Sequence, residues 1–184
     1  MFPIAYLQVH RLNNMTSFIP VTKESFDKVY DKMKAAFPLE ERRNSFDEKN
    51  CLNDNKFKLF EIFDDEKEVG FIALWVFSEF IFIEHLAIDS DKRNGGYGSK
   101  ALKLVKEKYN RTIILEAEAP ETEQQIKRIR FYDRHGFKVN DFPYMQPSYH
   151  GGKGVPLKIL SFPRLISQEE FDNFITLTRK YVYK

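Results

Sequence analysis

The sequence predicts an α/β (α+β) fold in a single domain, in which a run of paired strands is flanked by helices. Strand-like runs at 57–63, 69–77 and 80–88 follow one another across short polar turns, which is typical of antiparallel hairpins. Apolar residues at helical spacing indicate amphipathic helices before and after these strands. With 184 residues, 42% hydrophobic and 30% charged, the chain is large enough to bury a core of its own.

Composition excludes several classes of function. A net charge of +2 without a Lys/Arg block argues against nucleic acid, and no apolar run is long enough to span a membrane. The single Cys51 rules out an internal disulfide, and its neighbours favour a structural role over a nucleophilic one. The four histidines lie far apart without ligand spacing, so we expect no metal site.

The two ends of the domain are also predicted. Because Met15 follows a segment without a basic leader or a cleavage site, we expect residues 1–14 to be an extension rather than a signal peptide. The domain is then 15–184, and we expect it to reside in the cytoplasm.

The N-terminal part predicts a strand and two helices. A strand at 17–21 is followed by a helix with Thr22, or alternatively Ser25, as its N-cap and Pro38 as its end. The charged segment 39–50 predicts a second, exposed helix. Its charges, from Glu40 to Arg43, form either a solvated face or the rim of a substrate cleft.

The remainder of the chain alternates between helices and strands. The nearly all-apolar run 69–77 predicts a central strand that pairs antiparallel with 80–88. The later elements that we expect are a helix at 98–109, a strand at 112–117, a helix opened by Glu121 or Thr122 and stopped by Gly136, a strand at 137–139, a loop at 141–156, a strand at 157–162 and a C-terminal helix.

Glycines between a strand and a helix mark the centre of the chain. Segment 81–105, IFIEHLAIDSDKRNGGYGSKALKLV, passes from an apolar strand through a charged linker to three glycines and an amphipathic helix. Such glycines let the backbone approach a bulky ligand, and the first N–H groups of the helix are free to bind an anion. The segment therefore predicts a site for a phosphate-bearing cofactor.

Two motifs fit these glycines. As G-x-G-x-x-A (GYGSKA), they match a dinucleotide fingerprint, with Glu116 about twenty residues on as the ribose ligand. The spacer 89–94, the preceding hairpins and the few elements that follow all oppose such a NAD or FAD site. As R-x-x-G-x-G (RNGGYG), the loop offers its N–H groups to a pyrophosphate, with charge from Arg93 and Lys92.

The second motif resembles that of the GNAT superfamily of N-acetyltransferases. LAIDSDKRNGGYGSKALKLV is similar to the strand–loop–helix that binds acetyl-coenzyme A, and IRFYDRHGFKV to the family's downstream helix–strand motif. The order of elements agrees over about 17–162. The resemblance implies a three-layer architecture, with a central mixed, largely antiparallel twisted sheet of six to seven strands and helices on both faces.

The resemblance also implies acetyl-CoA, or coenzyme A, as the cofactor. The pantetheine arm would pair with the backbone of the strand at 86–88, where an N–H, that of Leu86 first, would polarise the thioester carbonyl. The implied cofactor-binding residues are Leu86, Ala87, Ile88, Arg93, Asn94, Gly95, Gly96, Tyr97, Gly98, Ser99 and Tyr132.

Catalytic residues are predicted on the same grounds. Tyr132 matches the family tyrosine near the coenzyme sulfur, an acid for the leaving thiolate; the alternative is a helix tyrosine packed on the sheet. Glu84 interrupts an apolar strand, where a carboxyl pKa can rise, and is our first candidate for the general base. Otherwise Glu84 positions the ammonium or a water, or pairs with a cation. In a regular strand His85 faces the opposite way, so only one of the two is expected to face the cleft.

The acceptor site is predicted less closely. Glu116 and Glu118 are further candidates for the base, although the run at 118–120 (EAP) departs from the asparagine that many family members carry there. The loop 144–152 is either a lid over the acceptor pocket or an ordinary surface loop. The predicted substrate contacts are Glu84, Glu118, Tyr144 and Tyr149.

The predicted function is direct transfer of an acetyl group, in a ternary complex, from acetyl-CoA to a primary amine of a small molecule or peptide. The identity of the amine stays open, and so does the question whether two copies of the chain form a homodimer. The alternatives are a Rossmann-like NAD- or FAD-binding protein and a non-catalytic acyl-CoA-binding domain on the same fold.

Overall fold

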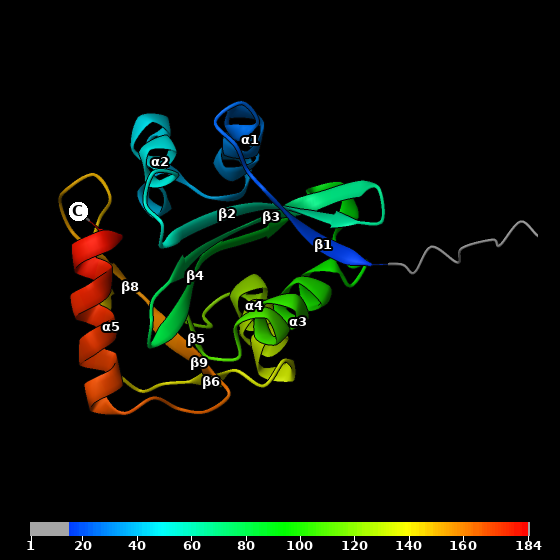
Figure 1. Ribbon diagram of the computed structural model, residues 1–184. Helices are drawn as coiled ribbons and strands as arrows, with labels where there is room; N and C mark the ends of the chain where they lie inside the picture. Colours follow the sequence, from blue (N-terminus) through cyan, green and yellow to red (C-terminus); the bar gives the residue numbers. More distant parts are fainter. Residues whose placement is uncertain (1–14, 184) are drawn as a thin grey trace, which may run out of the picture.

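The structure is a computed structural model that describes residues 15–183 (Figure 1). The extension predicted for 1–14 lies outside these residues. A seven-stranded mixed sheet, in the order β1-β2-β3-β4-β5-β9-β6, carries α3 and α4 on one face and α1, α2 and α5 against the other. This confirms the predicted three-layer fold. No helix in the described part of the chain is long and apolar enough to cross a bilayer.

The sheet elements are β1 (Thr16–Pro20), β2 (Phe57–Asp64), β3 (Lys67–Val76), β4 (Phe80–Ile88), β5 (Thr112–Ala117), β6 (Lys138–Val139) and β9 (Lys158–Phe162), with β7 (Met145–Gln146) and β8 (Val155–Pro156) as a separate ladder. The helices are α1 (Phe26–Ala36), the 3₁₀ turn η1 (Leu39–Glu41), α2 (Ser45–Cys51), the 3₁₀ turn η2 (Ser90–Lys92), α3 (Tyr97–Tyr109), α4 (Glu123–Arg134) and α5 (Gln168–Tyr181).

Two apolar cores lie on the two faces of the sheet. Alternate residues of the strands point to opposite faces, so Phe82 enters the core under α1 and α5, while Ile81 and Ile83 enter the core under α3 and α4. Trp75, on the first face, and Leu102, from α3 on the second, have no exposed surface. Each face is thus sealed by its own helices.

Three local predictions differ from the structure. Ser25, not Thr22, is the N-cap of α1, because Thr22 and Ser25 close a turn by bonding each other's backbone N–H (3.0 and 3.3 Å). The single helix predicted at 39–50 is divided, since the Asn44 side chain accepts from the N–H of Asp47 (2.9 Å) and starts α2 anew. The loop predicted at 141–156 contains the β7–β8 ladder.

The C-terminal predictions are confirmed in more detail. Thr122 caps α4 in a capping box with Gln125, and Gly136, at φ +80°, follows the end of that helix. The last strand, β9, pairs antiparallel with both β5 and β6. The predicted NAD or FAD alternative fails here, because β4 and β5 are the only parallel pair among the described strands, whereas a dinucleotide fold needs a mainly parallel sheet.

The parallel pair is also where the sheet opens. Pairing between β4 and β5 runs from Phe80 with Thr112 to Ile83 with Leu115 and goes no further. Both strands continue, β4 to Ile88 and β5 to Ala117, so their C-terminal halves diverge. The carboxyl ends of neighbouring parallel strands are where open α/β sheets place ligands.

Candidate active site

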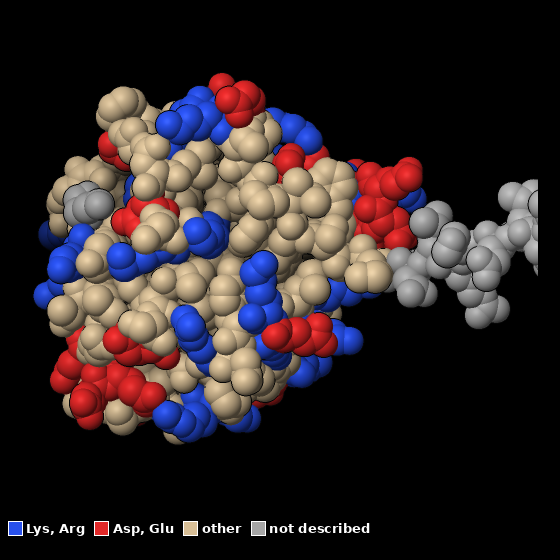
Figure 2. All heavy atoms as spheres, viewed as in Figure 1, with Lys and Arg blue, Asp and Glu red and all other residues tan. Residues whose placement is uncertain are grey.

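A cavity of about 580 Å³ occupies this opening. Its walls come from the diverging ends of β4 and β5, the loop 92–99, one side of α4, and Gln146 and Leu157 from the segment that follows. The volume is that of an ordinary small-molecule or cofactor site. Figure 2 shows Lys and Arg side chains near the middle of the face of the molecule drawn there, over α3 and α4.

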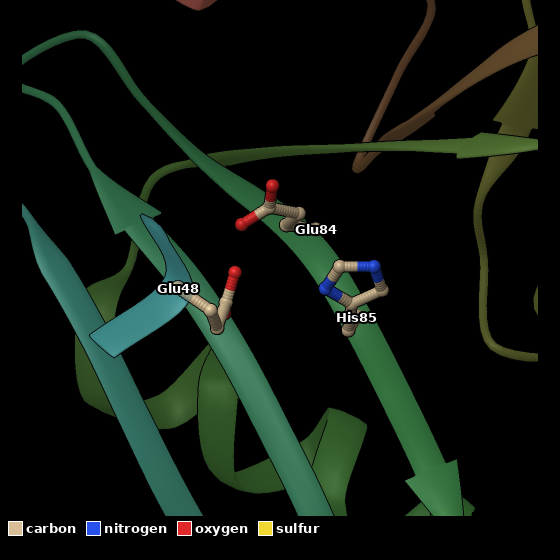
Figure 3. Close-up of side chains that lie close together, drawn as sticks. All are labelled: Glu48, Glu84 and His85. Atoms are coloured by element: carbon tan, nitrogen blue, oxygen red, sulfur yellow. The ribbon is translucent and has the colours of Figure 1, made fainter. Parts of the chain in front are cut away.

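A β-bulge in β4 turns two polar side chains toward the same face. Ala73 of β3 is paired with His85 and the next residue, Leu74, with Ile83, so Glu84 has no partner of its own. Glu84 and His85 therefore both lie beside Glu48 of α2 (Figure 3). The prediction that only one of them faces the cleft is wrong, since it assumed a regular strand.

A buried ion cluster holds the Glu84 side chain. Arg43 donates from Nη1 to Glu48 and from Nη2 to Glu84, both at 2.8 Å. Trp75 Nε1 (2.8 Å) and the Tyr149 hydroxyl (2.7 Å) donate to the two oxygens of the Glu84 carboxylate. Burial raises the pKa of Glu84, but the Arg43 charge, the nearby His85 and the hydrogen bonds from Arg43 and Tyr149 together outweigh it, and the pKa lies below the ordinary value. This is opposite to the raised pKa that the sequence suggested.

The same cluster brings together atoms of the kind that bind metals. Potential ligand atoms of Glu48, Glu84 and His85 lie within 4.8 Å of one another (Figure 3). The guanidinium of Arg43 already supplies the positive charge that both carboxylates need. His85 Nε2 donates to the carbonyl oxygen of Glu41 at 2.9 Å, which ties β4 to η1. We assign the cluster to anchoring η1 and α2 against the bulge.

Glu116 faces the cleft from β5 and is enclosed by a second polar cluster. Its carboxylate accepts hydrogen bonds from the Tyr144 hydroxyl (2.5 Å), Gln146 Nε2 (2.6 Å) and the Tyr183 hydroxyl (2.7 Å). Burial raises the pKa of Glu116 to about 7 against the effect of these donors, and the nearby charge of Glu84 adds to the rise. Glu116 thus titrates near neutrality.

The predicted acceptor residues are only partly brought together. Tyr149 reaches Glu84 and Tyr144 reaches Glu116, so the loop that carries them packs on the cleft. Glu118 instead lies beyond β5 and pairs with Arg128 of α4 at 2.6 Å. Sequence reasoning included Arg43 in the possible cleft rim and Gln146 in the possible lid without giving either a role of its own, and it did not select Tyr183. No local pattern marks the three, because each meets its carboxylate across a long stretch of chain.

The predicted cofactor loop has the backbone geometry of an anion site. Gly96 is the N-cap of α3 with φ +77°, and the first bond of the helix runs from Lys100 N–H to its carbonyl (3.1 Å). The N–H groups at 97–99 precede that bond, so the helix itself leaves them unpaired. Five cationic residues line the cleft beside this loop and along α4: Lys92, Arg93, Lys127, Arg128 and Arg134.

The end of β4 presents backbone groups to the opening. Asp89 N–H bonds to the Val69 carbonyl (3.0 Å), and Ile88 is opposite Gly70 in the adjacent pair. Because bonded and non-bonded pairs alternate in an antiparallel ladder, Leu86 and Ile88 direct their N–H and C=O groups away from β3. No strand pairs with β4 on that side after Ile83 within the described chain, so these groups face the cavity.

Tyr132 lines the cavity from α4. Its ring packs edge-on against Phe131 and Phe137, at centroid distances of 5.2 and 5.6 Å. Burial raises the pKa of Tyr132 to about 12, with Arg128 acting in the opposite direction. The phenol is therefore protonated throughout the neutral range.

Comparisons with known proteins agree with this geometry. Residues 55–139 match a family model described as "Acetyltransferase (GNAT) domain". The chain is 32% identical to the solved "Putative acetyltransferase from GNAT family" of Bacteroides thetaiotaomicron, with a TM-score of 0.84 over 91% of this chain and 98% of that one. It is 29% identical over 146 residues to "Putative acetyltransferase YjbC" of Bacillus subtilis (strain 168), covering 77% of this chain and 73% of that protein. At 14% identity, Arabidopsis thaliana NAA60, solved with acetyl-CoA, shares the fold at a TM-score of 0.62 over 80% and 98% of the two chains.

Proposed function

The chain belongs to the GNAT family of acetyltransferases, and from this premise we propose that it transfers the acetyl group of acetyl-CoA directly to a primary amine of a small molecule or peptide in a ternary complex. The observation that carries the proposal is the opening between β4 and β5. Around this one cavity lie a helix N-terminus with N–H groups that the helix leaves unpaired, strand backbone without a partner strand and a carboxyl group of pKa about 7, and these support the proposal.

The cofactor occupies the α3–α4 side of the cavity in this proposal. The N–H groups of 94–99 bind the pyrophosphate, assisted by Arg93, and the backbone of Leu86, Ala87 and Ile88 pairs with the pantetheine arm. The thioester carbonyl then lies near Leu86, whose N–H supports the oxyanion. Reaction within one complex supplies much of the acceleration by orientation alone.

Replacing Gly96 with alanine tests this loop, and we expect the Kd for coenzyme A to rise about tenfold by calorimetry. An added Cβ meets nothing within 4 Å, so the change acts through the φ of +77°, which costs about 1–2 kcal/mol in a residue with a side chain. Gly151 is a matched control, with φ +74° and the same free space. Gly151→Ala should leave the Kd unchanged; equal effects of the two changes would refute the assignment.

Two carboxylates face the amine in different roles. Glu84 is ionised and held by three donors, so we assign it to attracting and orienting the ammonium through its charge. Glu116 keeps a pKa near neutrality, which suits a group that must accept a proton from the amine and later release it. We therefore propose Glu116, rather than Glu84, as the general base.

Tyr132 is the proposed proton donor to the departing thiolate. The expected result of Tyr132→Phe is a fall in kcat of about 10- to 100-fold with little change in the KM for acetyl-CoA, since the ring packing against Phe131 and Phe137 is kept. Tyr109→Phe is the control, because Tyr109 is also a partly buried helix tyrosine but does not line the cavity. Equal rates for the two variants would remove Tyr132 from the mechanism.

The function as a whole is tested by thermal stabilisation with acetyl-CoA, followed by free-thiol release across a panel of amines. We expect stabilisation by several degrees at saturating cofactor and thiol release with at least one amine. A chain that acetyl-CoA does not stabilise is not a coenzyme A enzyme. One that is stabilised but releases no thiol with any amine is instead the non-catalytic acyl-CoA-binding domain.

A further inference from the structure

One buried hydrogen-bonding atom at the acceptor end of the cleft has no partner. Gln146, on β7, is 7% exposed and lines the cavity. Its Nε2 donates to Glu116 Oε2 (2.6 Å) and to the Tyr183 oxygen (3.1 Å), while its Oε1 is bonded to nothing in the described chain. In its ionised form Glu116 only accepts hydrogen bonds, so the end of the Gln146 amide that faces it is then the nitrogen. A buried carbonyl oxygen without a partner is unfavourable, so this oxygen is placed to accept a hydrogen bond from a bound ligand.

The side-chain donors of the two polar clusters around Glu84 and Glu116 are already engaged. Trp75 Nε1 and the Tyr149 hydroxyl are bonded to Glu84. The hydroxyls of Tyr144 and Tyr183 are bonded to Glu116. The deeply buried Arg43 is bonded to Glu48, to Glu84 and to the Val182 carbonyl.

Two donors at the edge of this region are also engaged. Arg128, which lines the cleft from α4, is bonded to Glu118 at 2.6 Å, and His85 Nε2 is bonded to the Glu41 carbonyl. Two acceptors remain at this end of the cleft: Gln146 Oε1, which has no partner in the described chain, and the Glu116 carboxylate, whose three donors leave part of its accepting capacity unused. His85 Nδ1 is the other buried side-chain atom of the described lining without a partner. Neither Gln146 Oε1 nor the ionised Glu116 carboxylate can donate a hydrogen bond to an anion.

We infer that the acceptor is a primary amine with no carboxylate or phosphate beside the reactive nitrogen, and that Gln146 Oε1 and Glu116 receive its N–H groups. This inference rests on the proposed function and specifies its substrate. An ammonium brings three donors and a positive charge, which match the two acceptors and the negative charge of the region. A free α-amino acid adds a carboxylate that must lose its water without gaining a partner, and such discrimination is strong when buried polar groups are left unpaired.

The test uses amines that differ only at the carbon beside the nitrogen. Pentylamine, norleucinamide and norleucine form one series; phenethylamine, phenylalaninamide and phenylalanine form another. With the wild-type chain and acetyl-CoA, we expect kcat/KM from thiol release to be at least about 100-fold lower for the two carboxylates than for the best member of their series. Norleucine or phenylalanine within tenfold of its series would overturn the inference and leave acetyl transfer standing. No thiol release from any of the six would overturn both.

A variant tests the part played by Gln146. We expect Gln146→Leu to raise the KM for the best amine about tenfold or more while the KM for acetyl-CoA stays within twofold, a split that a general loss of structure would not give. Gln168→Leu, at an exposed position on α5, should change neither KM. An unchanged amine KM in Gln146→Leu removes Gln146 from the site. The amine series needs no variant, so it decides the substrate class even if Gln146→Leu fails to fold.

Discussion

Arg43→Met is expected to lower the free energy of unfolding by about 3–5 kcal/mol, measured by urea denaturation at pH 7. Methionine fills much of the same volume but leaves the carboxylates of Glu48 and Glu84 buried without their cation. The two side chains are 0% and 1% exposed, so water cannot replace the guanidinium. The Val182 carbonyl loses its donor as well.

Three further measurements separate the charge from the packing. Arg130→Met, at an exposed position on α4, should change stability by no more than about 0.5 kcal/mol. Adding Glu48→Gln to Arg43→Met should restore part of the loss, because it removes one of the two unpaired charges. The loss should also shrink at acidic pH, where the stranded carboxyls take up protons. If Arg43→Met costs less than about 1 kcal/mol, the ion cluster does not anchor η1 and α2.

The parts of the structure that the sequence predicted well depend on local patterns. The amphipathic spacing of Phe26 to Met33, the Thr122 cap and the glycine loop each arise within one or two turns of chain, where propensity and periodicity act. The cofactor side of the cleft is built from just such pieces. Its layout was therefore predictable, and the family resemblance added which strand the loop follows.

The acceptor side was less predictable, because it depends on a bulge and on contacts between distant segments. Glu84 and His85 are both polar, so the pattern of polar and apolar residues does not reveal the bulge that interrupts the alternation of side chains at this point of the strand. Arg43 stands in a charged run that equally suits a solvated face, yet it crosses to a strand 41 positions away. Tyr183 reaches Glu116 across 67 positions. Such pairs are set by tertiary packing alone.

Glu116→Gln is expected to lower kcat/KM for the amine by about 100- to 1,000-fold near pH 8, as loss of a general base does. The pH profile gives the sharper result. In the wild type, Glu116 (pKa about 7) must be ionised to take the proton of the bound ammonium (pKa about 10), so log kcat/KM should rise with a slope near 1 below pH 7 and level off above it. The variant should keep a slope near 1 throughout. A slope that still changes near pH 7 would assign the titration to another group.

Glu116→Gln should also stabilise the fold at alkaline pH, because it removes a carboxylate whose burial disfavours its charge. This result would distinguish a carboxylate kept for catalysis from one that holds the structure together. The folded pKa of Glu116, about 7, lies above its unfolded value of 4.5, so its contribution to stability is full below pH 4.5 and is lost as pH rises to 7. Glutamine does not titrate, so the advantage of the variant should grow over that window. By pH 8 the stability advantage of the variant should reach at most about 3 kcal/mol. Water in the cleft screens the charge and reduces this figure. A variant that is both slower and less stable at pH 8 would make Glu116 a structural member of the tyrosine cluster instead of the base.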